Sequence, residues 1–240
     1  MIWIIGGTCE TRELVKRLNG RKDYIITAAT EDGKQFIDSQ NLLIGRMDYH
    51  EMVKFIQENQ IKLVIDLSHP YAVLVSKNAQ RAASSQNVKY IRYVRPQAVF
   101  TDCVIYKKSL DECIEYLKSV SGTVFFTTGS KNIGRFEKIK GNNRFVYRIL
   151  PSIPGIEECK KYNVLIKDVV AMLGPFSVEL NRAMFKEYDA DYVIMKDSGI
   201  EGGTNEKIKA CINLGIVPVV IGREKEEGIE DLDEIVELIC

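Results

Sequence analysis

Short apolar runs alternate with helical segments along the whole chain, and this alternation restricts the possible folds more than any other feature. Each run ends at glycine or small polar residues and is followed by apolar residues at the spacing of one helix face. Strands that alternate with helices form parallel sheets with both faces covered, so the sequence predicts the α/β class. The predicted strands are 2–5, 24–29, 42–44, 63–65, 89–94, 123–126, 144–150, 169–173, 192–195 and 217–221.

The alternation is interrupted once, after Arg95 and Pro96, where residues 97–102 are predicted to cross between two halves. We therefore expect two Rossmann-like parallel-sheet domains, 1–98 and 99–240. Open α/β sheets bind ligands at the carboxyl ends of their strands. Since polar and glycine residues collect at these ends in both halves, we expect the domains to face each other across a cleft. The first is the candidate dinucleotide-binding domain, and the second completes the cleft.

Composition argues against several classes of partner. The 33 basic residues are balanced by 33 acidic residues, so no overall field attracts nucleic acid or an anionic membrane surface. The six cysteines contain no C-x-x-C pair, and with two histidines they show no metal-ligand spacing. No stretch approaches the roughly 18 apolar residues of a membrane span, and a signal peptide pattern is missing. We expect a cytoplasmic protein without a metal site, a nucleic-acid partner or a membrane partner.

The first predicted strand runs into Gly6, Gly7 and Thr8 and then into a helix. Glycines permit a sharp turn and a close ligand approach, and the helix directs N–H groups and its positive end towards that point. A phosphate is the natural occupant, although the full G-x-G-x-x-G pattern is missing and an ordinary α/β turn has the same composition. A cation in the first helical turn opposes the dipole, so Arg12 is a candidate ligand contact, the alternative being an exposed arginine without a role.

Glu31 follows the second predicted strand, about 20 residues past the glycines, where dinucleotide folds place the acid that binds the ribose hydroxyls. In that role it would repel a 2′-phosphate and favour NADH over NADPH. A polar turn before Gly33 has the same composition, so this alternative stays open.

Further polar groups follow other predicted strands. Ser68 and His69 follow strand 63–65 and precede a helix that either residue can cap, and His69 also lies at the strand edge where ligands bind. The segment T-T-G-S-K at 127–131 offers hydroxyls and a cation suited to phosphate or carboxylate, and K-D-S-G at 196–199 ends a later strand. Each is ordinary turn chemistry by itself. Together they predict a ligand-binding edge in each half.

With these segments in place, the chain resembles the precorrin-6A reductase family of cobalamin biosynthesis over nearly its whole length. The segments are G-G-T-x-E-x-R at 6–12, D-x-S-H-P-Y-A at 66–72, R-x-x-R-P at 92–96, T-T-G-S-K at 127–131, G-P-F at 174–176, and K-D-S-G with a glycine pair at 196–203. The family more often has T-H-P-F-A in the second segment. Near the end, Gly222, Arg223 and Glu224 stand where the family has arginine-proline, which leaves a ligand role for Arg223 open.

The resemblance implies an NAD(P)H-dependent reduction of one carbon–carbon double bond in a ring-contracted tetrapyrrole, either precorrin-6A or its cobalt complex. Transient contact with neighbouring pathway enzymes is a further expectation. His69 is the first candidate proton donor and Lys196 the second. The expected cofactor contacts, for NADPH or NADH, are Gly6, Gly7, Thr8, Glu31, Thr128, Gly129 and Ser130. The expected substrate contacts are Arg12, Ser68, Arg95, Lys131 and Ser198.

Two other interpretations use the same paired lobes. One is a two-lobed small-molecule sensor or binding protein, against which the lack of a DNA-reading helix or an effector domain counts. The other is a transferase with a nucleotide-activated donor, which needs no nicotinamide. A test of nicotinamide cofactor binding separates the transferase from the reductase.

Overall fold

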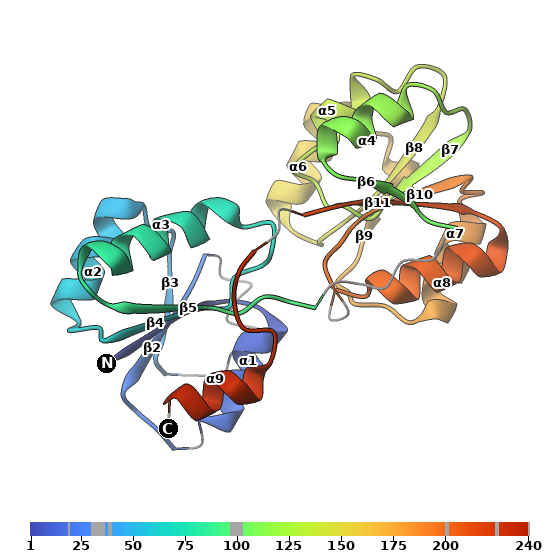
Figure 1. Ribbon diagram of the computed structural model, residues 1–240. Helices are drawn as coiled ribbons and strands as arrows, with labels where there is room; N and C mark the ends of the chain where they lie inside the picture. The colour runs from blue at the N-terminus through green and yellow to red at the C-terminus, as the bar shows by residue number, and fades with distance from the viewer. Residues whose placement is uncertain are drawn as a thin grey trace. The chain divides into compact units, whose positions relative to one another are not determined.

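The computed structural model describes residues 1–18, 20–29, 37, 40–96, 103–199, 202–223 and 226–239. The chain forms two compact units, one of Met1–Arg95 together with Lys225–Cys240 and one of Pro96–Glu224. Each unit contains one parallel sheet with helices on both faces, as Figure 1 shows, so the predicted α/β fold with two parallel sheets is confirmed. The predicted crossover at 97–102 lies outside the described residues.

The first sheet has the strand order β3-β2-β1-β4-β5, with all neighbours parallel. Helices α1 and α9 cover one face and α2 and α3 the other (Figure 1). Strand order reverses direction between β1 and β4, which is where doubly wound sheets open a ligand-binding crevice. The elements are β1 (Ile2–Gly6), α1 (Cys9–Arg17), β2 (Tyr24–Ala28), β3 (Leu42–Ile44), α2 (Tyr49–Glu58), β4 (Leu63–Asp66), α3 (Val73–Ser85), β5 (Lys89–Arg92) and α9 (Leu232–Ile239).

The second sheet has the order β6-β11-β10-β7-β8-β9, again all parallel. Its order reverses between β7 and β10, so it repeats the topology of the first sheet with β6 added at one edge. Helices α4, α5 and α6 pack on one face and α7 and α8 on the other. The elements are β6 (Ile105–Lys107), α4 (Leu110–Leu117), β7 (Thr123–Phe126), α5 (Ile133–Glu137), β8 (Arg144–Ile149), α6 (Ile153–Lys161), a 3₁₀ turn (Ile166–Asp168), β9 (Val169–Ala171), α7 (Val178–Glu187), β10 (Tyr192–Lys196), α8 (Thr204–Leu214) and β11 (Val217–Ile221).

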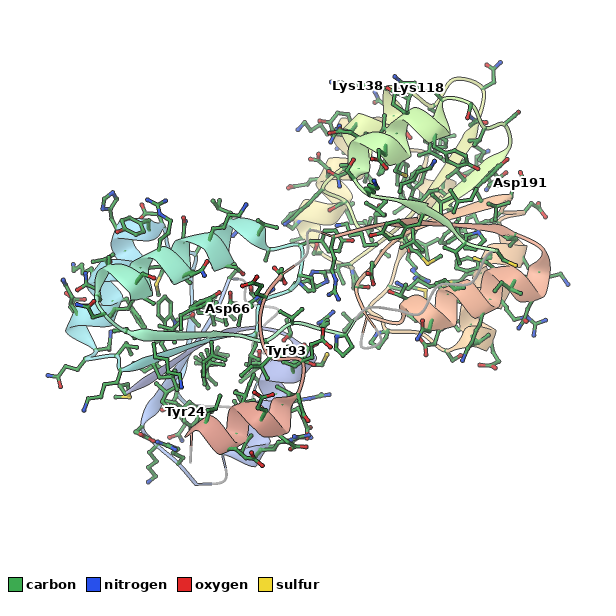
Figure 2. The ribbon with its side chains drawn as sticks, viewed as in Figure 1. Tyr24, Asp66, Tyr93, Lys118, Lys138 and Asp191 are labelled. Carbon is green, nitrogen blue, oxygen red and sulfur yellow. The ribbon has the colours of Figure 1, made fainter. Side chains whose placement is uncertain are left out.

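The domains predicted from the sequence were 1–98 and 99–240. The two units of the structure differ from them at the C-terminal end, where helix α9 belongs to the first unit. Its apolar side chains Ile235 and Ile239 are buried in the same cluster as Ile4 and Leu14. Tyr93, labelled in Figure 2, also forms a parallel bridge with Ile229 just before α9. The returning chain therefore covers the face of the first sheet beside α1, an apolar surface that α1 alone leaves exposed.

Candidate active site

Two predicted segments meet at the switch point of the first sheet. Strands β1 and β4 are neighbours in register, with Ile5 opposite Asp66. Just beyond them, the Leu67 N–H donates to the Ile5 carbonyl at 2.8 Å, and the Thr8 hydroxyl donates to the Leu67 carbonyl at 3.1 Å. The glycine turn at 6–8 and the loop that contains His69 are thus directly hydrogen-bonded to each other.

The geometry of the glycine turn depends on Thr11, a residue that the sequence analysis did not single out. Any side chain at Gly6 would overlap with the Thr11 side chain, which is fully buried. Thr8 is the N-cap of α1 and forms a reciprocal capping box with Thr11. Gly7 has φ +107°, a conformation that side chains rarely adopt. The turn therefore presents bare backbone at the N-terminus of α1.

An ion pair lies beside this turn. Arg95 bonds both carboxylate oxygens of Glu10, at 2.5 Å from Nε and 3.0 Å from Nη2, and both side chains are buried. Burial by itself would raise the pKa of Glu10, but the hydrogen bond and charge of Arg95 outweigh it and lower the pKa. Arg95, predicted as a substrate contact, thus has an internal partner at the first turn of α1. Arg12 instead is exposed and forms no ion pair with any described residue.

His69 lies in a turn between β4 and α3. Helix α3 begins after Ala72 without a side-chain cap, so the prediction that Ser68 or His69 caps it is wrong. The chain makes a separate turn first, in which the Ala72 N–H donates to the His69 carbonyl at 2.7 Å. The Tyr71 N–H donates to Nδ1 of His69 at 3.2 Å. Because Nδ1 accepts this bond, the ring in this geometry is neutral and carries its hydrogen on Nε2.

A buried polar network under the same loop accounts for Ser68. Arg92 of β5 donates to the Ser68 carbonyl at 2.8 Å and forms ion pairs with Asp66 at 3.2 Å and Glu226 at 3.0 Å. The Tyr90 hydroxyl donates to the second oxygen of Asp66 at 2.7 Å. Asp66, labelled in Figure 2, is fully buried at the end of β4. Ser68 is therefore part of the support for the loop, and Arg92 ties β4, β5 and the C-terminal segment together.

The second unit brings its predicted segments together in the same way. Beyond β7, the Thr127 N–H donates to the Ile194 carbonyl of β10 at 2.8 Å. Thr128 is buried, and its hydroxyl has no hydrogen-bond partner among the residues that the structure describes. Gly129 has φ +77° and faces open space. A buried hydroxyl without a partner beside an open glycine fits a polar ligand atom at the switch point of this sheet.

Cations flank this second edge. Lys131 is exposed, and Lys196 at the end of β10 is partly buried. Burial, followed by the charge of Lys131, lowers the pKa of Lys196. Ser198 is buried in the next turn, where its N–H donates to the Thr204 hydroxyl at 3.2 Å. Arg223 forms a buried ion pair with Asp197 at 3.8 Å, so it holds the ends of β10 and β11 together.

Three further predictions concern Glu31, metal ligands and membrane-spanning helices. Glu31 lies outside the described residues. Among the residues that the structure does describe, no cluster of three histidine, cysteine, aspartate or glutamate side chains could hold a metal ion. No helix in that part of the chain is long and apolar enough to cross a bilayer.

Lys207 lies on α8 and was not among the predicted site residues. Its burial makes the stability of the protein depend on pH in a way that can be measured. It is buried, and burial, followed by the charge of Arg148, lowers its pKa to about 7. Between pH 7 and 9 the unfolded chain binds a proton at Lys207 that the folded chain releases. The free energy of unfolding is therefore expected to gain about 1.4 kcal/mol per pH unit from this residue. Burial raises the pKa of Cys113 and Cys211 to about 12, so above about pH 9 these thiols lose their protons in the unfolded chain but keep them in the folded chain. This lowers the free energy of unfolding as the pH rises and opposes the gain from Lys207.

Urea unfolding at pH 7, 8 and 9 measures this slope. In the Lys207→Met variant, the increase in the free energy of unfolding per pH unit should be smaller than in the unmodified protein by that amount. In Lys209→Met, at an exposed position of the same helix, the increase should be unchanged. Equal slopes for the Lys207→Met variant and the unmodified protein would contradict the lowered pKa.

Comparisons with known proteins identify the family and the fold. The family model of precorrin-6x reductase CbiJ/CobK matches residues 1–240. The cobalt-precorrin-6A reductase of Priestia megaterium is 34% identical over 95% of this chain and 92% of its own length. The enzyme of the same description from Salmonella typhimurium is 33% identical over 92% of this chain and 87% of its own length. A solved structure described as CobK precorrin-6A reductase has a TM-score of 0.81 at 18% identity, covering 99% of this chain and 95% of that chain, and therefore shares the fold.

Proposed function

Because the chain belongs to the precorrin-6x reductase CbiJ/CobK family, we propose that it uses NADPH or NADH to reduce one carbon–carbon double bond of cobalt-precorrin-6A. The match of the family model to the whole chain carries the proposal. The cobalt form is favoured over the metal-free form because the relatives from Priestia megaterium and Salmonella typhimurium are both described as cobalt-precorrin-6A reductases. The metal belongs to the substrate, so the protein needs no ligands for it.

The first unit suits a dinucleotide. Its strand order and the glycine turn at the switch point between β1 and β4 are the arrangement in which Rossmann folds bind a pyrophosphate at a helix N-terminus. Gly6 permits close packing of α1 on β1, and Gly7 keeps the backbone bare. The cofactor supplies a hydride when it is bound. The tasks of the protein are to hold cofactor and macrocycle in contact, to exclude water and to deliver a proton.

The substrate carries several carboxylates, which an electrically neutral protein must bind with local cations. Arg12 in the first unit and Lys131 and Lys196 in the second are the cations at the two switch points. His69 lies beside the glycine turn, so it is our candidate for protonating the carbon next to the one that receives the hydride. It would act as the imidazolium, in which Nδ1 carries a hydrogen and no longer accepts the Tyr71 N–H. Lys196 is the second candidate.

Cofactor oxidation, followed by nicotinamide absorbance, tests the function. Purified protein is mixed with NADPH or NADH and with precorrin-6A, with and without cobalt. Consumption that requires the macrocycle supports the reductase, and a faster rate with the cobalt complex supports the cobalt form. Folded protein that consumes neither cofactor with either macrocycle would contradict the proposal and favour the binding-protein or transferase alternative.

The cofactor preference gives a separate prediction for Glu31. If its carboxylate binds the ribose hydroxyls, Glu31→Ala removes a charge that repels a 2′-phosphate. The ratio of kcat/KM for NADPH over NADH is then expected to rise about tenfold, which is within the range of a charge pair near a protein surface. Glu58→Ala, at an exposed position of α2, is the matched control. An unchanged ratio for Glu31→Ala would exclude Glu31 from the ribose site.

A further inference from the structure

Two cations are buried in the second unit without an acidic partner. Arg148 of β8 is 8% exposed and Lys207 of α8 is 7% exposed. Among the described residues, no carboxylate lies within ion-pair distance of either side chain. The Arg148 guanidinium donates to Oδ1 of Asn181 at 2.8 Å and lies over the Phe176 ring at 4.6 Å. Buried charges are normally paired, so two unpaired cations indicate a site for an anion.

The position of Arg148 is maintained by a second layer of contacts. Asn181 is almost fully buried and donates its amide hydrogens to the carbonyls of Phe176 at 3.1 Å and Ser177 at 2.8 Å. This orients its oxygen towards Arg148. Phe176 belongs to the G-P-F segment at 174–176, to which the proposed function assigns no role. The segment therefore fixes one of the two cations.

The glycine pair at 202–203 lies against the G-P-F segment and Lys207. A side-chain carbon added at Gly203 would lie 3.4 Å from Cβ of Pro175, 3.7 Å from Oε2 of Glu206 and 3.9 Å from Cε of Lys207. Gly203 is also the residue before α8 and has φ +66°, so the helix N-terminus opens here. Glu206 Oε2 is buried, and no described residue forms a hydrogen bond with it. Gly203 therefore lies where the G-P-F segment, Glu206 and Lys207 come together.

The charges of this cluster select the type of anion. When Lys207 is protonated, Arg148 and Lys207 contribute two positive charges and Glu206 one negative charge, which leaves one positive charge to be balanced. One carboxylate balances it, whereas a phosphate carrying nearly two negative charges would exceed it and repel Glu206. We propose that Arg148 and Lys207 form a buried subsite for one carboxylate side chain of the tetrapyrrole substrate. The assignment to the tetrapyrrole rests on the proposed function, while the carboxylate site itself does not.

Protonation of Lys207 supports the same assignment. Burial, followed by the charge of Arg148 on β8, lowers its pKa to about 7, and Glu206 and Cys211 on α8 are the other titratable neighbours. A bound carboxylate favours the charged amine. Binding is therefore expected to take up a proton near pH 8, which calorimetry in buffers of different ionisation enthalpy detects.

The experiment compares Lys207→Met and Arg148→Met with Lys209→Met, an exposed control on the same helix. In the first arm sodium propionate is the probe, and the urea midpoint of the unmodified protein and of the Lys209→Met variant should rise with its concentration, with no rise in either subsite variant. In the second arm macrocycle binding is followed by its absorbance without cofactor. Each subsite variant should weaken it by about 10–100-fold, the range for a hydrogen bond to a charged group. The Kd of NADPH should stay within about twofold.

Each outcome separates the possibilities. If Lys207→Met binds propionate and macrocycle as the unmodified protein does, the subsite is wrong, while turnover can still support the reductase. If propionate stabilises the unmodified protein through Lys207 but no macrocycle binds, the carboxylate site stands and the proposed function fails. If instead affinity for NADPH or inorganic phosphate falls in the variants, the site holds a phosphate and the proposal is overturned. Should Lys207→Met not fold, Lys207→Arg must retain the propionate response.

Discussion

Replacement of His69 by alanine is expected to lower kcat about 10²–10⁴-fold, the usual contribution of a positioned general acid. The Kd of NADPH should stay within about twofold, because His69 is proposed to act on the macrocycle. The neutral ring, whose Nδ1 accepts the Tyr71 N–H at 3.2 Å, is too weak an acid for this step, so the proton donor would be the imidazolium. Hydride addition to a conjugated ring creates negative charge that a nearby proton donor neutralises. The measurement is steady-state NADPH oxidation together with cofactor binding by fluorescence.

The other histidine of the chain supplies the control. His50 is exposed on α2, and His50→Ala should leave kcat and the Kd of NADPH unchanged. Urea unfolding of His69→Ala shows whether the turn before α3 has been lost. An unchanged kcat in folded His69→Ala would limit His69 to a role in the turn and make Lys196→Ala the next variant to measure.

Arg92→Met is expected to lower the free energy of unfolding by about 3–5 kcal/mol, the typical effect of breaking a buried ion pair. The substitution leaves the fully buried Asp66 carboxylate without its ion-pair partner and removes the contact to Glu226. The Tyr90 hydroxyl still donates to Asp66, so part of the carboxylate remains satisfied. Equilibrium urea unfolding measures the loss.

A double-mutant cycle isolates the charge pair. Asp66→Asn combined with Arg92→Met should cost less than the sum of the two single variants, because the isolated buried charge is then absent. Arg135→Met is the surface control, since Arg135 pairs with Asp111 where both side chains are exposed. It should cost less than about 1 kcal/mol. Equal losses for Arg92→Met and Arg135→Met would mean that the buried network contributes little to stability.

The sequence by itself determined the class of fold and where the polar turns lie. A strand followed by glycine and a helix is a local pattern, set by side-chain periodicity and backbone freedom within about 20 residues, as in β1, Gly6 and α1. For this reason, the polar or glycine segments at 6–8, 68–70, 127–131, 174–176 and 196–199 all lie at or just after strand ends in the structure. The short strand β6 was missed because Ile105–Lys107 ends in a lysine, whereas the equally short Leu42–Ile44 is an unbroken apolar run.

The tertiary structure alone decided which distant residues meet. Arg92 contacts Glu226, and α9 returns to the first sheet. Arg148 lies on strand β8 and Lys207 on helix α8, far apart in the chain. From the sequence alone, each would be taken for an ordinary surface cation. Whether such a residue is exposed or buried beside another depends on strand order and helix packing. Periodicity along the chain carries no information about either, because both are set by which surfaces bury each other.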